Sequence, residues 1–322
     1  MDESLTTPVP PSVSVIIPTF NRLGMLREAI ASCFVGNQAV DVEVVVVDDG
    51  SRDGTVEYLA TLHEPRVRVF SQGHLGPQTA RNLGLQEARG EFVKFLDDDD
   101  WLCPGALAIE IRALRDHDAD LVAGDILVVD DTTKTHVKLA GPKCADPLID
   151  LLRGVTTHPL RFSARTALAR QVTWNENLRC RQDLDYFLKV AALAAHAVSI
   201  DLPVACFRSH AGIRVSSARS REALAAHLSI LCDFATYLTR GGLLSDDRRL
   251  ALLDSLWTWI YINTVSEWPS ARRAWQLIQT LAQAPFRPRR NSPVLRLFDQ
   301  LLGPMVTQRV IAPVRRLKTI IK

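Results

Sequence analysis

The chain lacks the features that mark zinc-binding, disulfide-rich or membrane-spanning proteins. Its six cysteines are widely spaced, with no CxxC pair and no cluster of cysteine and histidine, so neither a zinc site nor a disulfide framework is predicted. No run of about 18 uninterrupted apolar residues occurs. The nearest candidate, 186–207, contains Lys189, His196, Asp201 and Pro203, which would be costly in lipid. We therefore expect a cytoplasmic protein with reduced thiols that does not span a membrane.

An excess of charge of one sign is also absent. The 38 basic and 36 acidic residues leave a formal net charge of +2, so no overall positive field indicates a nucleic-acid partner. The GxGxxG fingerprint of dinucleotide-binding domains and the GxxxxGK[ST] motif of P-loop proteins do not occur. Residues 1–11 are acidic and proline-rich and lack the apolar core of a signal peptide, so they are expected to form a disordered tail.

What the chain does have is an alternation of β-branched runs with helical periodicity. This alternation predicts an α/β fold with a mostly parallel central sheet, flanked by helices and joined by right-handed crossovers. The first strand is expected to stop at Pro18, and Asn21 is expected to cap the helix that follows. Further helices are expected to begin at about Thr55, Pro77 and Pro104. The predicted strands are 13–17, 42–47, 67–70 and 91–96.

Three of these strands end in polar turns that should meet at one edge of the sheet, where ligands of open α/β sheets bind. A nucleotide could be held there if Asp49 accepts a base N–H, Phe20 stacks on the base and Arg81 reaches a phosphate. This convergence predicts a nucleotide site more strongly than any single motif does. The turns are 18–21, 48–51 and 97–100.

The last of these turns holds four consecutive aspartates before Trp101. Their repulsion opposes folding unless a cation lies among them. On an extended backbone Asp97 and Asp99 would project to one face, and Asp98 and Asp100 to the other. Such a pair of carboxylates suits Mg²⁺ or Mn²⁺. The alternative is an acidic turn that is only solvated.

Four segments of the chain form a recognisable series: VSVIIPTFNR (13–22), VVVVDDGSRDGT (44–55), ARNLGLQEARGEF (80–92) and FLDDDDW (95–101). Together they resemble the successive signatures of glycosyltransferase family 2, over residues 12 to about 215. The resemblance implies the GT-A fold and an inverting transfer from a nucleotide-diphosphate sugar. It also implies a catalytic domain over 12–217, in which 12–101 bind the nucleotide sugar and 102–217 bind the acceptor and carry the catalytic group.

The resemblance assigns roles to particular residues of this chain. Asp99 is the implied metal ligand, although the extra aspartate allows the assignment within 97–100 to shift by one position. His210 would complete the metal shell or contact the diphosphate, unless it is an ordinary surface histidine. For Arg81 and Asn82 the alternative role is packing at a helix N-terminus. The implied donor-binding residues are Pro18, Thr19, Phe20, Asn21, Asp49, Gly50, Ser51, Arg81, Asn82, Asp97 and Asp98.

Asp183 is the expected catalytic base. An inverting transfer needs a base that takes the proton of the acceptor hydroxyl. The segment around Asp183 resembles the family's Glu-Asp pair at the start of a helix, with Gln182 in place of the usual glutamate. The alternatives are that Asp183 only caps this helix, or that Asp185 is the base. Thr157 and His158 fall where family members line the acceptor pocket, and Gln182 is also assigned to the acceptor site.

Residues 218–322 show helical periodicity without a catalytic motif and are expected to form a helical C-terminal region. After residue 286 the only acidic residue is Asp299, and apolar positions recur at near-helical spacing. Basic amphipathic helices of this kind bind anionic membrane surfaces. The alternative is that they pack on the protein body with solvated arginines. The basic residues are Arg287, Arg289, Arg290, Arg296, Arg309, Arg315, Arg316, Lys318 and Lys322.

These observations lead to one expected activity. A sugar, with a UDP-sugar as the expected donor, would pass to a hydroxyl of a glycan, and a lipid-linked oligosaccharide of surface polysaccharide synthesis is the acceptor that the family and the basic tail suggest. A sugar-phosphate nucleotidylyltransferase is one alternative, but PTFNRLG is not the loop rich in glycine, arginine and lysine that it needs after its first strand. A catalytically impaired nucleotide-sugar-binding regulator is the other alternative, because of Gln182.

Overall fold

The computed structural model divides into two compact units, which are taken separately below. The first comprises Met1–Pro147 and Val155–Val215, and the second comprises Leu148–Gly154 and Ser216–Lys322. The domain boundaries inferred from the sequence stay a prediction. Nearly all of the predicted N-terminal tail, and His210, lie outside the residues that the structure describes. These residues are 11–133, 135–209, 221–264, 266–288 and 293–311.

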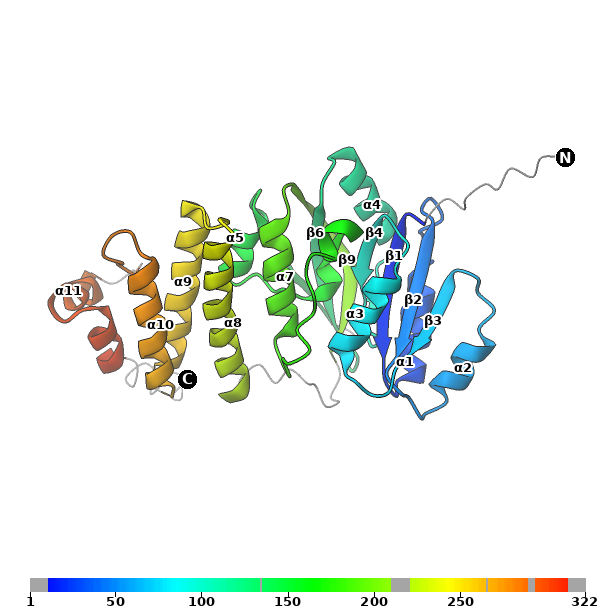
Figure 1. The fold of residues 1–322 in the computed structure, drawn as a ribbon, viewed down its shortest axis with the longest axis horizontal. Coiled ribbons are helices and arrows are strands. Elements are labelled where there is room, and N and C mark those ends of the chain that lie inside the picture. Colours follow the sequence, from blue (N-terminus) through cyan, green and yellow to red (C-terminus); the bar gives the residue numbers. More distant parts are fainter. Residues whose placement is uncertain (1–10, 134, 210–220, 265, 289–292, 312–322) are drawn as a thin grey trace. The chain divides into compact units, whose positions relative to one another are not determined.

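One sheet organises the first unit (Figure 1). In the part of the chain that is described, its nine strands run in the order β3-β2-β1-β4-β8-β6-β9-β5, with β7 beside β6. The neighbours β3-β2-β1-β4 are parallel, as are β6 and β9, whereas β8, β5 and β7 pair in antiparallel fashion. The predicted α/β fold class is confirmed. The strands are β1 (Val13–Thr19), β2 (Val42–Asp48), β3 (Val67–Ser71), β4 (Phe92–Phe95), β5 (Trp101–Leu102), β6 (Leu121–Asp130), β7 (His136–Leu139), β8 (Phe162–Arg165) and β9 (Ala197–Ser209).

Two details at the end of β1 correct the expectations. The strand does not stop at Pro18 but runs through it to Thr19, in register with β2. The pairing of β1 with β4 ends at Ile16. Pro18 has no backbone N–H, but β4 offers no acceptor at this position, so no hydrogen bond of the sheet is lost. Asn21 does not cap the next helix, since it has a left-handed φ of 52°. The carboxylate of Asp53 accepts the first helical N–H instead, at 3.0 Å.

Helices cover both faces of this sheet. Alternate residues of a strand point to opposite faces, so Val15 packs with α1 and α4 while Ile16 meets α3. The continuous apolar runs of β1 and β2 are therefore buried on both sides, as is typical of parallel strands. The helices are α1 (Leu23–Ser32), α2 (Thr55–Thr61), α3 (Pro77–Glu87), α4 (Ala106–Asp116), α6 (Thr166–Ala169) and α7 (Gln182–Leu193), with a 3₁₀ turn at Pro159–Arg161; α5 (Pro147–Leu152) begins at the end of the first segment.

The second unit is helical where it is described. Ser245 caps α9 by accepting the N–H of Arg248 at 3.3 Å. Residues 304–311 are also helical. None of the helices in the described ranges has the length and apolar character needed to cross a membrane. The helices are α8 (Arg221–Arg240), α9 (Asp246–Asn263), α10 (Trp268–Leu281) and α11 (Pro293–Leu302).

Helix α3 packs so closely on β1 at Gly84 that a larger residue is not expected to fit there. A Cβ at this position would lie 2.4 Å from Cγ2 of Ile16, which is closer than real contacts allow. We predict that Gly84→Ala lowers the free energy of unfolding by about 1–3 kcal/mol, because the core is overpacked. Gly24→Ala in α1 is the control, since nothing lies within 4 Å of its Cβ. Urea unfolding should show Gly24→Ala to be neutral or more stable; equal losses for both variants would contradict the packing argument.

Candidate functional site

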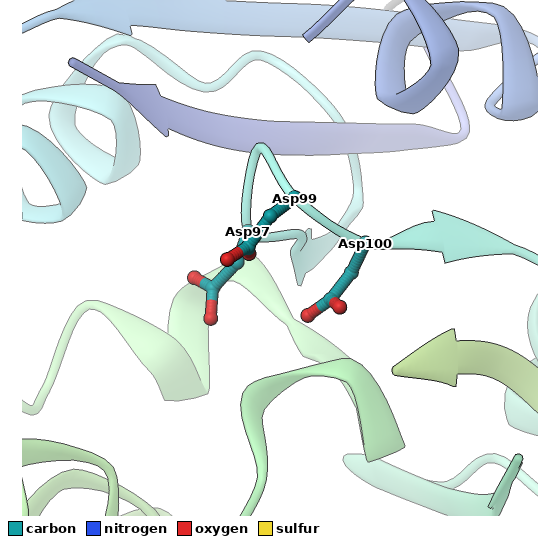
Figure 2. Close-up of side chains that lie close together, drawn as sticks. All are labelled: Asp97, Asp99 and Asp100. Atoms are coloured by element: carbon teal, nitrogen blue, oxygen red, sulfur yellow. The ribbon is translucent and has the colours of Figure 1, made fainter. Parts of the chain in front are cut away.

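The four aspartates lie in a tight turn after β4 rather than on an extended strand. The N–H of Asp100 donates to the carbonyl of Asp97 at 3.1 Å and closes the turn. Asp97, Asp99 and Asp100 each place a carboxylate oxygen within 4.8 Å of the others (Figure 2). The expected alternation of faces is therefore wrong, because the turn gathers three carboxylates on one side. Their oxygens form a donor set that suits a hard divalent cation.

Asp98 is not part of this group and joins the ends of two strands. Its Oδ2 accepts a hydrogen bond from Thr19 Oγ1 at 2.8 Å and a longer one from Phe20 N at 3.4 Å. Burial raises the pKa of Asp98 to about 6, against the opposing effects of Arg22 and Thr19. The polar end of β1 and the acidic turn after β4 are thus brought together, as the sequence predicted for one edge of the sheet.

Two arginines partly neutralise the turn. Arg22 Nη1 lies 3.0 Å from Asp98 Oδ1 and 2.7 Å from Asp99 Oδ2. Arg81 Nη2 lies 2.5 Å from Asp97 Oδ1. Burial is the largest single effect and opposes the ionisation of Asp97. The charge and hydrogen bond of Arg81, together with the effects of His158 and Arg22, nevertheless hold the pKa of this carboxyl below its usual value. Sequence reasoning missed Arg22, although this residue closes the first family segment, and it allowed for Asp100 only as a shift by one position from Asp99.

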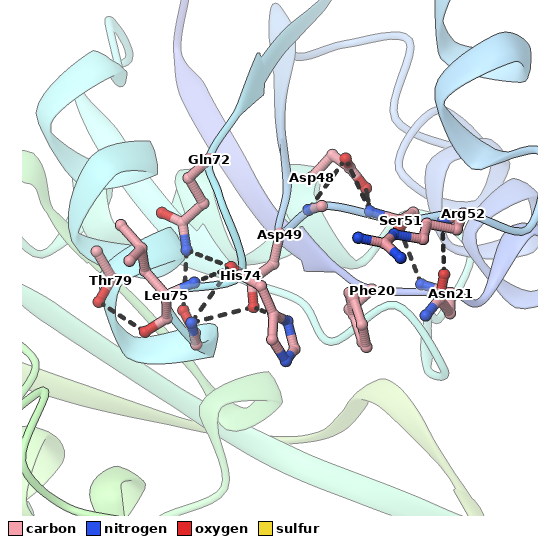
Figure 3. Close-up of polar contacts among 12 residues, drawn as sticks. Phe20, Asn21, Asp48, Asp49, Ser51, Arg52, Gln72, His74, Leu75 and Thr79 are labelled. Atoms are coloured by element: carbon pink, nitrogen blue, oxygen red, sulfur yellow. Dashed lines mark hydrogen bonds and ion pairs between the residues drawn. The ribbon is translucent and has the colours of Figure 1, made fainter.

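The second polar turn follows β2. Asp48 accepts the N–H groups of Gly50 and Ser51, both at 3.2 Å, which stabilises the turn. Ser51 Oγ accepts the N–H of Asn21 at 2.8 Å, and Asn21 Oδ1 accepts the N–H of Arg52 at 2.7 Å. Figure 3 shows these contacts, which join the turns after β1 and β2. The side chains of Asn21 and Ser51 therefore hold the two turns to each other.

Asp49 organises a third loop at the same edge (Figure 3). Its carboxylate accepts hydrogen bonds from Gln72 Nε2 at 2.7 Å and from Gly76 N at 3.0 Å. His74 Nδ1 lies 3.4 Å from Asp49 Oδ2, and the His74 ring packs on Phe20 with 4.3 Å between centroids. The N–H of Leu75 also donates to Asp49 Oδ1, at 2.7 Å, so the roughly four acceptor positions of the carboxylate are already engaged within the protein. A base N–H would therefore have to replace the longest of these contacts, that of His74. The exposed rings of Phe20 and His74 form an aromatic surface beside Asp49.

Arg81 and Asn82 lie on α3 and differ in how their polar groups are used. The Arg81 guanidinium packs over Trp174 at 4.7 Å and is buried, but its Nε and Nη1 have no hydrogen-bond partner. An incoming anion would satisfy these donors. Asn82 exchanges hydrogen bonds with the backbone of Trp174 at 3.0 and 2.9 Å and donates to Glu176 at 2.9 Å. Asn82 thus holds the segment that leads to α7.

Asp183 lies in the first turn of α7, as predicted, but the helix is not capped by a side chain at its N-cap residue, Arg181. Arg181 has a left-handed φ of 60°, a conformation that costs energy for a non-glycine residue and is often found at functional sites. Asp183 Oδ2 accepts a hydrogen bond from Thr157 Oγ1 at 3.2 Å. The competing carboxylate, Asp185, is buried and bound by Lys189 at 2.7 Å.

His158 follows Thr157, which binds Asp183. Its ring packs edge-on against Phe207 with 4.6 Å between centroids, and its buried Nδ1 has no hydrogen-bond partner. Burial lowers the pKa of His158, although the charges of Asp97 and Asp183 both act in the opposite direction. The effect of burial prevails and favours the neutral imidazole. The predicted acceptor-site residues Thr157 and His158 lie together with the predicted base.

The comparison with known families agrees with this geometry. Residues 14–170 match the family model described as glycosyl transferase family 2. Residues 14–170 belong to this family. The match leaves the nucleotidylyltransferase alternative without support.

Three known proteins illustrate the similarity. The chain is 45% identical over 103 residues to a GalNAc(5)-diNAcBac-PP-undecaprenol beta-1,3-glucosyltransferase of Campylobacter jejuni, covering 30% of this chain and 33% of that protein. It is 37% identical over 120 residues to the succinoglycan biosynthesis protein ExoO of Rhizobium meliloti, covering 37% and 34%. The chain thus spans about a third of the length of these curated relatives. The crystal structure of S. aureus TarS 1-349 in complex with UDP-GlcNAc has a TM-score of 0.70 at 21% identity, covering 95% of this chain and 92% of that chain, which confirms the GT-A fold.

The converging carboxylates predict a specific pattern of metal affinity. We predict that Asp97→Asn, Asp99→Asn and Asp100→Asn each weaken Mn²⁺ binding by at least about tenfold, because each removes a charge from the donor set. Asp116→Asn, an exposed site on α4, is the control and should bind Mn²⁺ like the wild type. Electron paramagnetic resonance of free Mn²⁺ measures the affinity. If Asp100→Asn bound Mn²⁺ as tightly as the wild type, the three converging carboxylates would not together form the metal site.

Proposed function

We propose that the chain is an inverting, metal-dependent glycosyltransferase that passes a sugar from a UDP-sugar to a hydroxyl of a glycan acceptor. The observation that carries this proposal is the convergence of Asp97, Asp99 and Asp100 at the edge of the sheet, with the charges of Asp97 and Asp183 both acting on His158. A metal-binding face and a candidate base would therefore share one site.

The acidic turn would hold the metal. Its oxygen donors fit Mg²⁺ or Mn²⁺, and a bound ion would offset the negative charge that develops on the leaving diphosphate. Arg81 would bind the same diphosphate through Nε and Nη1, the buried donors that have no partner in the protein. Asp98 would act indirectly, by keeping Thr19 and Phe20 beside the turn. His210 is also proposed as a metal or diphosphate contact, on the resemblance alone.

The other polar ends of the strands would bind the nucleoside. Asp49 would accept a base N–H, and the base would stack on the exposed rings of Phe20 and His74, which lie 4.3 Å apart. Pro18 and Gly50 would lie along this surface, because Pro18 is near the end of β1 and Gly50 follows the end of β2. The complex of TarS with UDP-GlcNAc supports a uridine nucleotide as the donor carrier.

Asp183 would take the proton of the attacking hydroxyl. Thr157 donates to one carboxylate oxygen and so fixes its orientation, while the second oxygen can face the acceptor. The partly buried His158 would stay neutral and offer a hydrogen bond to the acceptor. Gln182 can orient the acceptor as a neutral amide, without the charge of the usual glutamate.

The acceptor is proposed to be a lipid-linked glycan in polysaccharide synthesis. The printed names of the Campylobacter and Rhizobium relatives, with an undecaprenol-linked glycan and succinoglycan, support this class. The C-terminal region would hold the enzyme at an anionic membrane surface. Its exposed apolar side chains recur at helical spacing and are Leu297, Leu301, Leu302, Val306 and Val310.

The proposed base is tested by donor hydrolysis, which needs no known acceptor. We predict that Asp183→Asn lowers metal-dependent release of UDP from the best of a panel of UDP-sugars by about 10²–10⁴-fold, with donor binding unchanged by calorimetry. Asp185→Asn should keep activity within a few-fold, because Lys189 already binds its carboxylate. Full activity of Asp183→Asn would remove the base assignment, and binding without turnover by the wild type would favour the regulator.

The proposed membrane surface is tested by sedimentation with vesicles. We predict that the full chain pellets with vesicles containing anionic lipid, less so at high salt, and that Leu297→Ser/Leu301→Ser weakens binding by about tenfold, since two exposed leucines no longer enter the bilayer. Val137→Ser, an equally exposed apolar site on β7, is the control. Unchanged pelleting of a chain truncated after residue 286 would contradict the proposal.

A further inference from the structure

Arg208, near the end of β9, contacts the acidic turn through both its backbone and its side chain. Its backbone N–H donates to Asp100 Oδ1 at 2.8 Å. Its Nε donates to the backbone carbonyl of Asp99 at 2.9 Å. One residue thus fixes the carboxylate of Asp100 and the main chain of Asp99, two of the three residues whose oxygens converge.

The guanidinium of Arg208 is itself held from several directions. Nη1 lies 3.2 and 3.3 Å from the two carboxylate oxygens of Asp131, which follows β6, and Nη2 is bound by Glu28 of α1. Its plane packs over the indole of Trp101 at 4.6 Å. Trp101 in turn pairs with Cys206 in the short antiparallel ladder of β5 and β9. These contacts leave the Arg208 side chain only 11% exposed.

We propose that Arg208 is a positioning residue for the divalent-metal site, an inference that rests on the proposed metal-dependent function. Carboxylates that ligate one ion repel one another before the ion arrives, so the turn that carries them tends to open. Arg208 opposes this opening by tying the turn to β9, α1 and the segment after β6. Its side chain does so at a backbone carbonyl, which is not one of the oxygens that converge.

This role differs from those of Arg22 and Arg81. Arg22 binds carboxylate oxygens of Asp98 and Asp99, and Arg81 binds one of Asp97. Those contacts neutralise charge, and they engage the carboxylates of Asp97 and Asp99, which belong to the proposed metal-binding group. The side chain of Arg208 instead binds the backbone carbonyl of Asp99. It can therefore hold the turn without occupying a carboxylate oxygen, with or without a bound metal. Removal of outer-shell partners of this kind typically weakens metal affinity by about 10–100-fold.

The experiment measures Mn²⁺ binding to the full chain without donor, by electron paramagnetic resonance of free Mn²⁺. Arg208→Gln should raise the Kd by about 10–100-fold. Arg208→Lys keeps the charge but not the planar fork, and should lie between Arg208→Gln and the wild type. In UDP release, the Mn²⁺ concentration for half activity should rise in parallel, while kcat at saturating Mn²⁺ stays within about threefold.

Arg165→Gln is the matched control. Arg165 also bridges carboxylates, with Glu91 at 3.3 Å and Asp118 at 2.5 Å, and packs over Phe92 at 5.4 Å, but none of these belongs to the acidic turn. Its loss should change stability without moving the Kd for Mn²⁺ by more than about twofold, because the donor set is untouched.

The outcomes separate this inference from the proposed function. A wild type that binds no Mn²⁺ would overturn both, whereas a wild type that binds and an Arg208→Gln variant with the same Kd would overturn only the role of Arg208. If Arg208→Gln does not fold, Asp131→Asn and Glu28→Gln take its place. These remove the outer anchors of the guanidinium, and each should weaken Mn²⁺ binding; unchanged affinity in both would overturn the inference.

Discussion

The repulsion among four adjacent carboxylates is the constraint on which the site depends. Asp97 to Asp100 can be held in one turn only if cations and hydrogen-bond donors surround them. The protein supplies these from separate parts of the chain, with Arg22 before α1, Arg81 on α3 and Arg208 on β9. A cluster that is unfavourable by itself is thereby stabilised by the rest of the first unit.

The same contacts determine where the other polar turns lie. Because Asp98 binds Thr19 Oγ1, the end of β1 cannot move away from the acidic turn. The turn after β2 is joined to that after β1 through Ser51 and Asn21, and Asp49 positions the loop that leads to α3. Much of the polar edge of the sheet is therefore one connected network. A ligand that entered it would meet groups that are already held in place, which reduces the entropic cost of binding.

Much of this edge was predictable from local patterns. Apolar β-branched runs identify buried parallel strands, and the carboxyl ends of such strands meet at one edge for geometric reasons. The gathering of Asp97, Asp99 and Asp100 was not predictable, because strand alternation applies only where the backbone is extended and this segment turns. The cap of α1 was mispredicted for a related reason, since its acceptor, Asp53, comes from beyond β2.

The sequence by itself determined the α/β class, the family and the positions of the polar turns, because these follow from short-range periodicity and from motifs of contiguous residues. Only the tertiary structure decided that Thr157 binds Asp183 and that Arg208 holds the acidic turn. These residues lie far apart in the chain and carry no shared pattern. Their contacts arise from the order in which the strands enter the sheet, which is a property of the whole fold.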